Sequence, residues 1–427
     1  MFCHNYGLLK VQKFWVKSEN MKGKNKMDFP TEIIREGKVK VLVPKLKAFV
    51  KSPSEYAPSK APVFYNPIME LNRDIAVLAL QVYQSIVDRE LSVCEPLAGC
   101  GIRGIRFAME VGGVKEVVIN DISAAAFQLA SYNVRMNELT ERAIVRNEDA
   151  NFLLGSYGAP RKRFDTIDMD PFGSPVPYLD SAIRALRNGG LLILTATDMA
   201  PLCGVHPKAC IRKYGGKPLR TEYCHELAVR LLAGSLATTA AKHDMGIKII
   251  FSHSTDHYVR IYAVAKYGAR EADENVENLG YVLHCFKCLH REPVKGLFLV
   301  EHPEKCGECG SKINVAGPLW LGKLFDGQFC ELMRKELKQR AFAQSRKIGK
   351  ILTLIENEVE APVAYYVVDK LCGTLDVPVP PIKKIIEALE EAGFRAFLTH
   401  FNSKGIRSNA SASDMKKLLL EFSEAGW

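Results

Sequence analysis

The chain contains 427 residues, of which 47% are hydrophobic and 25% are charged. At about 100–200 residues per domain, this length predicts two or three domains, whose cores are large enough to fold without disulfide bonds. The composition is ordinary for a globular protein and excludes collagen-like and wholly disordered chains. No run of about 18 uncharged apolar residues is present, so we expect no membrane partner.

The net charge is +10, and the first 60 residues alone hold 13 Lys and Arg against 5 Asp and Glu. A basic excess at one end suits a polyanionic partner, although a solvated basic arm explains the same pattern. Residues 1–27 form a polar, Lys-rich lead-in that we expect to lie outside the fold. Because residues 1–26 lack the long apolar run of a secretory signal, we expect a cytoplasmic protein with mostly reduced cysteines.

The first predicted strand covers residues 38–43, and the first predicted helix covers 69–87, where Ile75, Leu78 and Val82 lie at helical spacing. Strands and helices then alternate through residue 195. The predicted strands are 91–95, 116–120, 143–146, 165–169 and 190–195, and the helices between them are one that ends at 109, then 124–136 and 178–186. This alternation predicts an α/β fold with a parallel sheet and helices on both faces.

The second half of the chain follows a different pattern. It begins with a predicted long helix at 222–241 and an antiparallel pair of strands at 247–251 and 258–266. A cysteine-rich module at about 281–315 and polar helices at 324–346 and 348–358 follow. Helices at 365–371 and 381–392 and a hairpin of 393–399 with 405–408 predict a winged-helix-like end. We therefore divide the chain into 1–27, an α/β domain at 28–275, a metal-binding module at 276–320 and a C-terminal domain at 321–427.

A glycine-rich loop follows the strand at 91–95. Gly99, Gly101 and Gly104 satisfy the pattern G-x-G-x-x-G. Glycine is needed where the backbone must turn tightly and approach a ligand without a Cβ in the way. Asp121 ends the next strand, the usual place for an acid that holds two ribose hydroxyls. NAD and S-adenosylmethionine both bind in this arrangement, and a glycine-rich turn with a capping acid is the alternative.

A further acid, Asp149, comes after the third strand of the alternating region and precedes Ala150. A carboxylate at this place can accept a hydrogen bond from the amino group of adenine. An exposed loop acid without a ligand explains the position equally well.

Asp170 follows the strand at 165–169 and begins the sequence Asp-Pro-Phe-Gly-Ser-Pro. Ligands of open α/β sheets bind at the carboxyl ends of strands. A carboxylate there can accept hydrogen bonds from an exocyclic amine and stabilise the positive charge that develops on nitrogen during methylation. Phe172 can stack on the base. Asp168 shares the face of Asp170 but should lie deeper, and a β-turn with a helix cap is the alternative interpretation.

The Asp-Pro-Phe sequence resembles the motif of methyltransferases that act on amino groups of nucleic acids, and a dehydrogenase has no use for it. Further passages resemble the tRNA (guanine-26) N2-dimethyltransferase family in its compact, archaeal-like form. They are residues 62–67, 71–74, 101–107, 120–123, 170–175, 195–198, 201–204, 206–207 and 399–401. The resemblance covers about residues 30–427. It implies a Rossmann-like class I methyltransferase domain that moves two methyl groups in succession from S-adenosylmethionine to N2 of one guanosine in tRNA.

The resemblance also implies roles for single residues. By motif matching, the cofactor would be held at its carboxylate end by Arg73 and Arg103, at its ribose by Asp121 and at its adenine by Asp149 and Ala150. Asp170 would be the catalytic carboxylate, and Phe172 would stack on the base. Arg73 has a physical rationale as well, because a guanidinium forks onto a carboxylate. A surface arginine on a helix is its alternative.

Four cysteines form two knuckles, Cys285-x2-Cys288 and Cys306-x2-Cys309. This pattern matches a four-thiolate zinc ribbon. We expect the zinc to be structural, because four protein ligands leave no open position. Disulfides or idle thiols are the alternative, and His284 and His290 flank one knuckle as substitute ligands.

Basic residues at 161–163 and 212–220 suit RNA phosphates, although a solvated face explains them equally well. We expect tRNA as the partner, and no obligate protein partner is evident. The target guanine would have to leave its stack to reach Asp170. Three alternatives remain: an amino-methyltransferase of DNA or ribosomal RNA, a non-catalytic RNA-binding protein that keeps the fold, and an NAD-dependent dehydrogenase.

Overall fold

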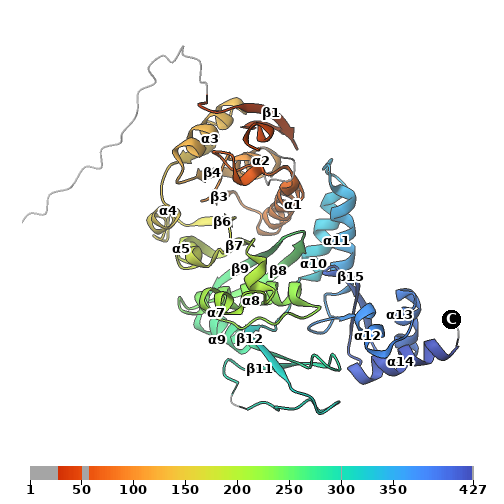
Figure 1. Ribbon diagram of the computed structural model, residues 1–427. Coiled ribbons are helices and arrows are strands. Elements are labelled where there is room, and N and C mark those ends of the chain that lie inside the picture. The colour runs from red at the N-terminus through yellow and green to blue at the C-terminus, as the bar shows by residue number, and fades with distance from the viewer. Residues whose placement is uncertain (1–26, 51–56, 300, 426–427) are drawn as a thin grey trace, which may run out of the picture.

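The computed structural model describes residues 27–50, 57–299 and 301–425, so all but the last residue of the predicted lead-in lies outside the described residues. The fold is built on a seven-stranded sheet in the order β5-β4-β3-β6-β7-β9-β8 (Figure 1). Its strands are β3 (Leu91–Glu95), β4 (Val114–Asn120), β5 (Ala143–Arg146), β6 (Phe164–Met169), β7 (Leu186–Ala196), β8 (Met245–Thr255) and β9 (Tyr258–Tyr267).

The strands from β5 to β7 pair in parallel, as predicted, and β9 lies antiparallel between β7 and β8. The chain moves outward from β3 through β4 and β5 on one side, and from β6 through β7 on the other. The order therefore reverses between β3 and β6. Ligands of open α/β sheets bind outside the carboxyl ends of the strands at such a switch point.

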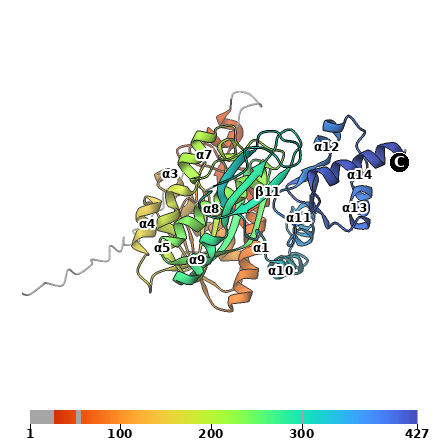
Figure 2. The same ribbon diagram turned by 90° about the horizontal axis from the view of Figure 1, so that it is seen from below.

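Helices surround this sheet (Figure 2). They are α1 (Glu70–Val87), α2 (Ile102–Glu110), α3 (Ala124–Met136), α4 (Ala150–Ser156), α5 (Leu179–Ala185), α6 (Met199–Leu202), α7 (Pro207–Tyr214), α8 (Cys224–Ala241) and α9 (Ala269–Glu277). The predicted helices at 69–87, 124–136 and 222–241 are confirmed within two residues. None of the described helices combines the length and apolar character that a membrane crossing requires.

Strand β6 carries the predicted catalytic motif at its carboxyl end, and all six of its residues are buried. A central strand of a parallel sheet is covered on both faces, which explains the burial of polar Asp165 and Asp168 as well as apolar Ile167. Each of these acids has a cationic partner, since Asp165 pairs with Arg89 and Asp168 pairs with Arg260.

An N-terminal hairpin precedes the sheet. Its strand β2 (Val39–Pro44) was predicted, but its strand β1 (Thr31–Glu36) was not. The hairpin is fastened to α3 by the amide of Asn133, which accepts from the N–H of Leu42 at 2.7 Å and donates to its carbonyl at 3.0 Å. This attachment brings the carboxylate of Glu36 to the buried face of α1.

The later part of the chain forms two further sheets. Strands β10 (Leu279–His284), β11 (Arg291–Lys295) and β12 (Asn314–Trp320) pair in the order β11-β10-β12. The C-terminal unit contains β13 (Tyr366–Val367), α12 (Val368–Leu375), α13 (Ile382–Glu391), β14 (Ala396–Thr399), β15 (Asn402–Ser408) and α14 (Ala412–Ala425), and it has its own apolar core. The predicted C-terminal hairpin is confirmed by the pairing of β14 with β15.

Helices α10 (Gly327–Leu337) and α11 (Ser345–Asn357) stand beside α1 (Figure 1) and contribute side chains to the main core. The prediction of one helix over 324–346 was wrong. Between α10 and α11, Arg340 donates to the carbonyl of Glu110 at 2.6 Å, and Phe342 packs 5.7 Å from the guanidinium of Arg106. These tertiary contacts hold the segment between Leu337 and Ser345 in a non-helical conformation.

The helix predicted at 365–371 begins later, at Val368, because residues 366–367 pair with β15 instead. The C-terminal unit is joined to α8 by Arg407 of β15, which binds Glu226 and Glu358 at 2.9 and 2.7 Å. The predicted domain boundaries at 275 and 320 stay predictions.

Candidate active site

A cavity of about 500 Å³ opens at the switch point of the sheet, at the carboxyl ends of β3 and β6. Four segments distant in sequence line it. They are residues 64–66 with Met69 and Arg73, the loop after β3 with Glu95, residues 97–100 and residues 102–103, the end of β4 with Asp121 and Ile122, and residues 170–172 with Tyr178 and Thr197. The structure thus brings together six of the predicted site residues: Arg73, Gly99, Arg103, Asp121, Asp170 and Phe172.

The glycine loop has the geometry that the sequence predicts. Gly99 adopts φ +55°, and a Cβ there would lie 2.9 Å from the carbonyl oxygen of Phe64. The N–H of Gly99 donates to Asp121 Oδ2 at 2.8 Å, and the N–H of Ser123 donates to Oδ1 at 2.9 Å. These bonds fix the carboxylate of Asp121 on the cavity wall. Gly101 does not line the cavity, and a Cβ there would lie 3.0 Å from the Cβ of Ala130 in α3.

Asp170 and Phe172 lie where β6 ends. The side chain of Asp170 is 18% exposed, whereas Asp168 is fully buried, as expected from its place one repeat further back. Phe172 is 73% exposed and meets the ring of Phe64 edge-on, with centroids 4.6 Å apart and planes at 85°. The turn between β6 and α5 is tied to β7, because the N–H of Gly173 donates to Thr197 Oγ1 at 2.7 Å. The site thus presents an acid beside an exposed aromatic ring.

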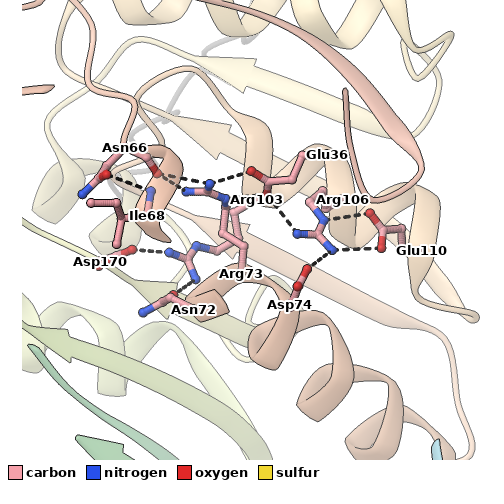
Figure 3. Close-up of polar contacts among 10 residues, drawn as sticks. All are labelled: Glu36, Asn66, Ile68, Asn72, Arg73, Asp74, Arg103, Arg106, Glu110 and Asp170. Carbon is pink, nitrogen blue, oxygen red and sulfur yellow. Dashed lines mark hydrogen bonds and ion pairs between the residues drawn. The ribbon is translucent and has the colours of Figure 1, made fainter. Parts of the chain in front are cut away.

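Arg103 of α2 connects the glycine loop to Asp170, and Figure 3 shows the two side chains facing each other. Its guanidinium binds Asp170 and donates to Asn72 Oδ1 at 2.6 Å. It also lies 3.6 Å from the carboxylates of Glu95 and Asp168. Burial raises the pKa of Glu95 to about 8, against the opposing effect of Arg103. Glu95 is therefore mostly neutral at pH 7. Asp168 and Asp170 are then the carboxylates that balance the positive charge of Arg103.

Arg73 of α1 is held from the N-terminal hairpin (Figure 3). Its Nε and Nη2 atoms both donate to Glu36 at 2.6 Å, and Nη1 and Nη2 reach the carbonyl oxygen of Asn66 at 3.3 and 3.2 Å. A guanidinium has five N–H groups. Four are used in these bonds, so one N–H of Nη1 is left for a ligand in the cavity.

Glu36 also binds Arg106 of α2, at 2.9 Å, and Arg106 in turn binds Asp74 and Glu110, both at 2.7 Å. Although burial alone would raise it, the two arginines hold the pKa of Glu36 below its usual value. Glu36 is therefore an ionised carboxylate shared by two buried guanidinium groups. The role of Glu36 was not predicted, since an acid in a short hairpin has no local sequence signature.

The structure does not bring Asp149 and Ala150 to the wall of the cavity. Asp149 caps the N-terminus of α4 by accepting from the N–H groups of Asn151 and Phe152 at 2.9 and 3.1 Å, and Ala150 is buried. Their part in adenine binding stays a prediction. No role was predicted for Phe64 and Tyr178, although residues 62–67 were among the passages that carried the family resemblance.

The four predicted metal ligands converge, and we call them the four-cysteine cluster: Cys285, Cys288, Cys306 and Cys309. Their sulfur atoms lie within 4.8 Å of one another, with Cys285 and Cys309 at 3.5 Å and Cys288 and Cys306 at 3.5 Å. Four thiolates at 2.3 Å from a tetrahedral zinc ion lie about 3.8 Å apart. All four are free thiols. The set therefore fits zinc without rearrangement of the backbone.

The two flanking histidines are engaged elsewhere. His284 contacts the hydroxyl of Tyr223 at 3.1 Å, and burial lowers the pKa of His284 to about 3. His290 contacts Glu308 at 2.9 Å. Neither histidine belongs to the group of ligand atoms that converge.

The sequence model of the N2,N2-dimethylguanosine tRNA methyltransferase family matches residues 37–420. The chain belongs to this family. It is 40% identical to the tRNA (guanine(26)-N(2))-dimethyltransferase of Methanobrevibacter smithii, over 93% of this chain and 99% of that protein. It is 38% identical to the tRNA (guanine(26)-N(2)/guanine(27)-N(2))-dimethyltransferase of Aquifex aeolicus, over 92% of this chain and 96% of that protein.

A solved structure of another member, Trm1 from Pyrococcus horikoshii in complex with S-adenosyl-L-methionine, has a TM-score of 0.80 to this chain. The sequences are 37% identical, and the match covers 91% of this chain and 99% of that one. The predicted Rossmann-like class I methyltransferase fold is thereby confirmed for this member of the family.

The cavity of this family member has groups that fit S-adenosylmethionine. Asp121 offers a fixed carboxylate for hydroxyl groups, and Arg73 retains one N–H for an anionic end. Leu97 and Ile122 supply apolar wall, and Gly99 exposes backbone where a Cβ would collide with Phe64. A ligand with a ribose, a carboxylate and a flat apolar ring matches this donor and acceptor set.

Proposed function

We propose that this chain is an S-adenosylmethionine-dependent methyltransferase that adds two methyl groups in succession to N2 of guanosine 26 in tRNA. The family membership and the names of the relatives support the substrate. The observation that carries the chemistry is the pair of Asp170 and Phe172 at the open edge of a cavity that fits the methyl donor. A dehydrogenase would need no such pair, and a non-catalytic scaffold would have no reason to retain it.

The residues divide between the donor and the acceptor. For the donor, we assign Arg73 and Arg103 to the carboxylate end, Gly99, Gly101 and Asp121 to the loop and the ribose, and Asp149 with Ala150 to the adenine side. When bound, S-adenosylmethionine supplies a methyl group on a positively charged sulfur. Tight, fixed contacts matter here because proximity and orientation provide much of the rate.

Asp170 acts on the acceptor. Its carboxylate accepts a hydrogen bond from the exocyclic amine and orients the nitrogen lone pair toward the donor. As the nitrogen gains positive charge, the carboxylate stabilises that charge and can receive the released proton. The guanidinium of Arg103 binds the carboxylate of Asp170 and fixes its position. Arg103 also lies close to Asp168, and Asp168 pairs with the buried Arg260. The partner of Asp170 is therefore itself held in place by buried charged groups.

Phe172 and Phe64 provide the surface for the base. Phe172 is largely exposed, and its ring is supported edge-on by Phe64, so one flat face is open to stacking. A guanine in the tRNA core must leave its stack to reach this face, which costs a few kcal/mol that the new stacking offsets. Basic residues at 161–163 and 212–220 are our candidates for contacts with tRNA phosphates.

The four-cysteine cluster holds a structural zinc ion in this proposal. Leu283 and Ile313 pack around the sulfur atoms in a small apolar core of their own. Since so few apolar residues are available there, the metal would provide most of the stability of this module.

The test is incubation of the full chain with an unmodified tRNA transcript and S-adenosylmethionine, followed by nucleoside mass spectrometry. We expect N2-methylguanosine and then N2,N2-dimethylguanosine, and neither product with a transcript that carries adenosine at position 26. Asp170→Asn should lower the rate at least about 100-fold while donor affinity stays near wild type. Asp180→Asn, an exposed acid on α5, is the matched control and should be fully active. Near-normal turnover by Asp170→Asn would show that the assigned role is wrong.

A further inference from the structure

A second group of metal-ligating side chains is distinct from the four-cysteine cluster. Cys203 follows α6, and Cys224 and His225 begin α8. One ligand atom from each of these three residues lies within 4.8 Å of the other two. None of the three side chains is buried, so a cation has access to the group from solvent.

The donor set selects the kind of ion. Two thiols and an imidazole are the ligands of zinc and similar borderline or soft cations, whereas magnesium and calcium require oxygen ligands. Around a tetrahedral zinc ion, with bonds of about 2.0–2.3 Å, these atoms would lie about 3.5–3.8 Å apart. Because the ligand atoms lie within 4.8 Å of one another, each contact needs to close by at most about 1.0–1.3 Å, a shift on the scale of a change in side-chain torsion angle. Both cysteines are free thiols.

The backbone on both sides of the cluster is fixed. The N–H of Cys203 donates to the carbonyl of Met199 at 2.7 Å, and a Cβ on the adjoining Gly204 would lie 2.7 Å from the N atom of Arg220. At the other side, Glu226 of α8 is buried and paired with Arg230 at 2.8 Å. The ligands therefore project from two segments that are already held in place, and only the side chains need to adapt.

The position of Cys224 at the start of α8 also favours its thiolate form. The helix is 18 residues long, and Cys224 is its first residue. The N–H groups at a helix N-terminus stabilise a thiolate, which is the form of cysteine that binds metals. This effect adds to the convergence of three ligand atoms.

We propose that Cys203, Cys224 and His225 form a second zinc-type site, with three protein ligands and a water molecule in the fourth position. The site differs from the four-cysteine cluster in being open, so its ion exchanges more readily with chelators. Its position gives it a consequence for the cavity. The ion would bridge α8 to the segment that begins at Asp198, directly after Thr197 of the cavity wall. The proposal does not depend on the methyl-transfer reaction.

Metal stoichiometry tests it. The full chain is expressed with added zinc, freed of loose metal by gel filtration, and analysed for metal and protein by mass spectrometry. We expect about two zinc ions per chain in the wild type, and about one after Cys203→Ser or after mild treatment with EDTA. Cys330→Ala, which removes a buried cysteine of α10 outside both clusters, is the matched control and should retain about two.

Cobalt substitution identifies the ligands of each ion. The second equivalent of Co²⁺ should show weaker thiolate-to-metal absorption than the first, because it has two thiolates instead of four, and this second band should vanish in Cys203→Ser/Cys224→Ser. A wild-type chain that binds only one equivalent, with no further uptake when zinc is added, would overturn the proposal. So would a second ion that persists in the double variant, or a disulfide between Cys203 and Cys224 in the freshly purified protein.

Discussion

Glu36→Gln tests whether the N-terminal hairpin positions Arg73 for the methyl donor. In the structure, the carboxylate of Glu36 accepts from Nε and Nη2 of Arg73, both at 2.6 Å, and from Nη1 of Arg106 at 2.9 Å. Glutamine keeps the size of the side chain but offers one acceptor oxygen, and its amide N–H groups face a guanidinium that is also a donor. Arg73 should therefore lose its fixed orientation.

Hydrogen bonds to charged groups contribute about 1.5–3 kcal/mol each. Losing one of the two orienting bonds should weaken S-adenosylmethionine about tenfold, which corresponds to about 1.4 kcal/mol. The same change should lower the free energy of unfolding by about 3–5 kcal/mol, because a buried ion pair is broken. The stability effect alone would not identify the role of Glu36, so a control must reproduce it.

Glu110→Gln is that control. Glu110 accepts from Nε of Arg106 at 2.7 Å and has no hydrogen bond to Arg73 (Figure 3). Both variants loosen Arg106, whereas only Glu36→Gln releases Arg73. Calorimetry should therefore show weakened binding of S-adenosylmethionine in Glu36→Gln and near-normal binding in Glu110→Gln.

A second ligand separates orientation from general damage. 5′-Methylthioadenosine keeps the adenosine and the sulfur but lacks the carboxylate that Arg73 would bind. Its affinity should be unchanged in Glu36→Gln. Equal weakening of both ligands, or equal behaviour of the two variants, would refute the assignment of Arg73 to the carboxylate.

Three more predictions follow from other parts of the structure. Phe172→Ala should raise the KM for tRNA by about tenfold, since stacking on an aromatic ring contributes about 1–3 kcal/mol per base, and leave donor affinity unchanged; steady-state kinetics with both substrates checks this. His400 and Arg407 outweigh burial and lower the pKa of Glu358 to about 2, so its carboxylate stabilises the fold above the pKa of the unfolded chain, near 4.5, and this stability of about 3 kcal/mol is lost as the pH falls toward 2. Urea unfolding should show that loss in the wild type and a flatter acid profile in Glu358→Gln, and identical profiles would contradict this role of Glu358. Removing the metal from the four-cysteine cluster with a strong chelator should open residues 285–309 to protease while the sheet of the α/β domain stays protected, and a cleavage pattern that does not change would argue against a structural ion.

The sequence predicted much of the α/β domain because the relevant signals are local. Alternating apolar strands and amphipathic helices identified the parallel sheet, and the glycine loop and the acid at the end of β6 lie where a parallel sheet must place them. The spacing of the cysteines predicted their convergence in the same way. Helix ends held by distant contacts, as at Arg340 and Phe342, were not predicted, because no local pattern encodes a partner some 230 residues away.

Sequence alone determined the chemistry that this chain carries, since an acid, a proline and an aromatic side by side are fixed by covalent order. Tertiary structure decided which acid pairs with each arginine of the cavity. Glu36 pairs with Arg73 across 37 positions of the sequence, and Asp170 pairs with Arg103 across 67. Burial is the physical reason. A guanidinium removed from water must find a carboxylate, and only the folded arrangement of hairpin, helix and strand determines which one it finds.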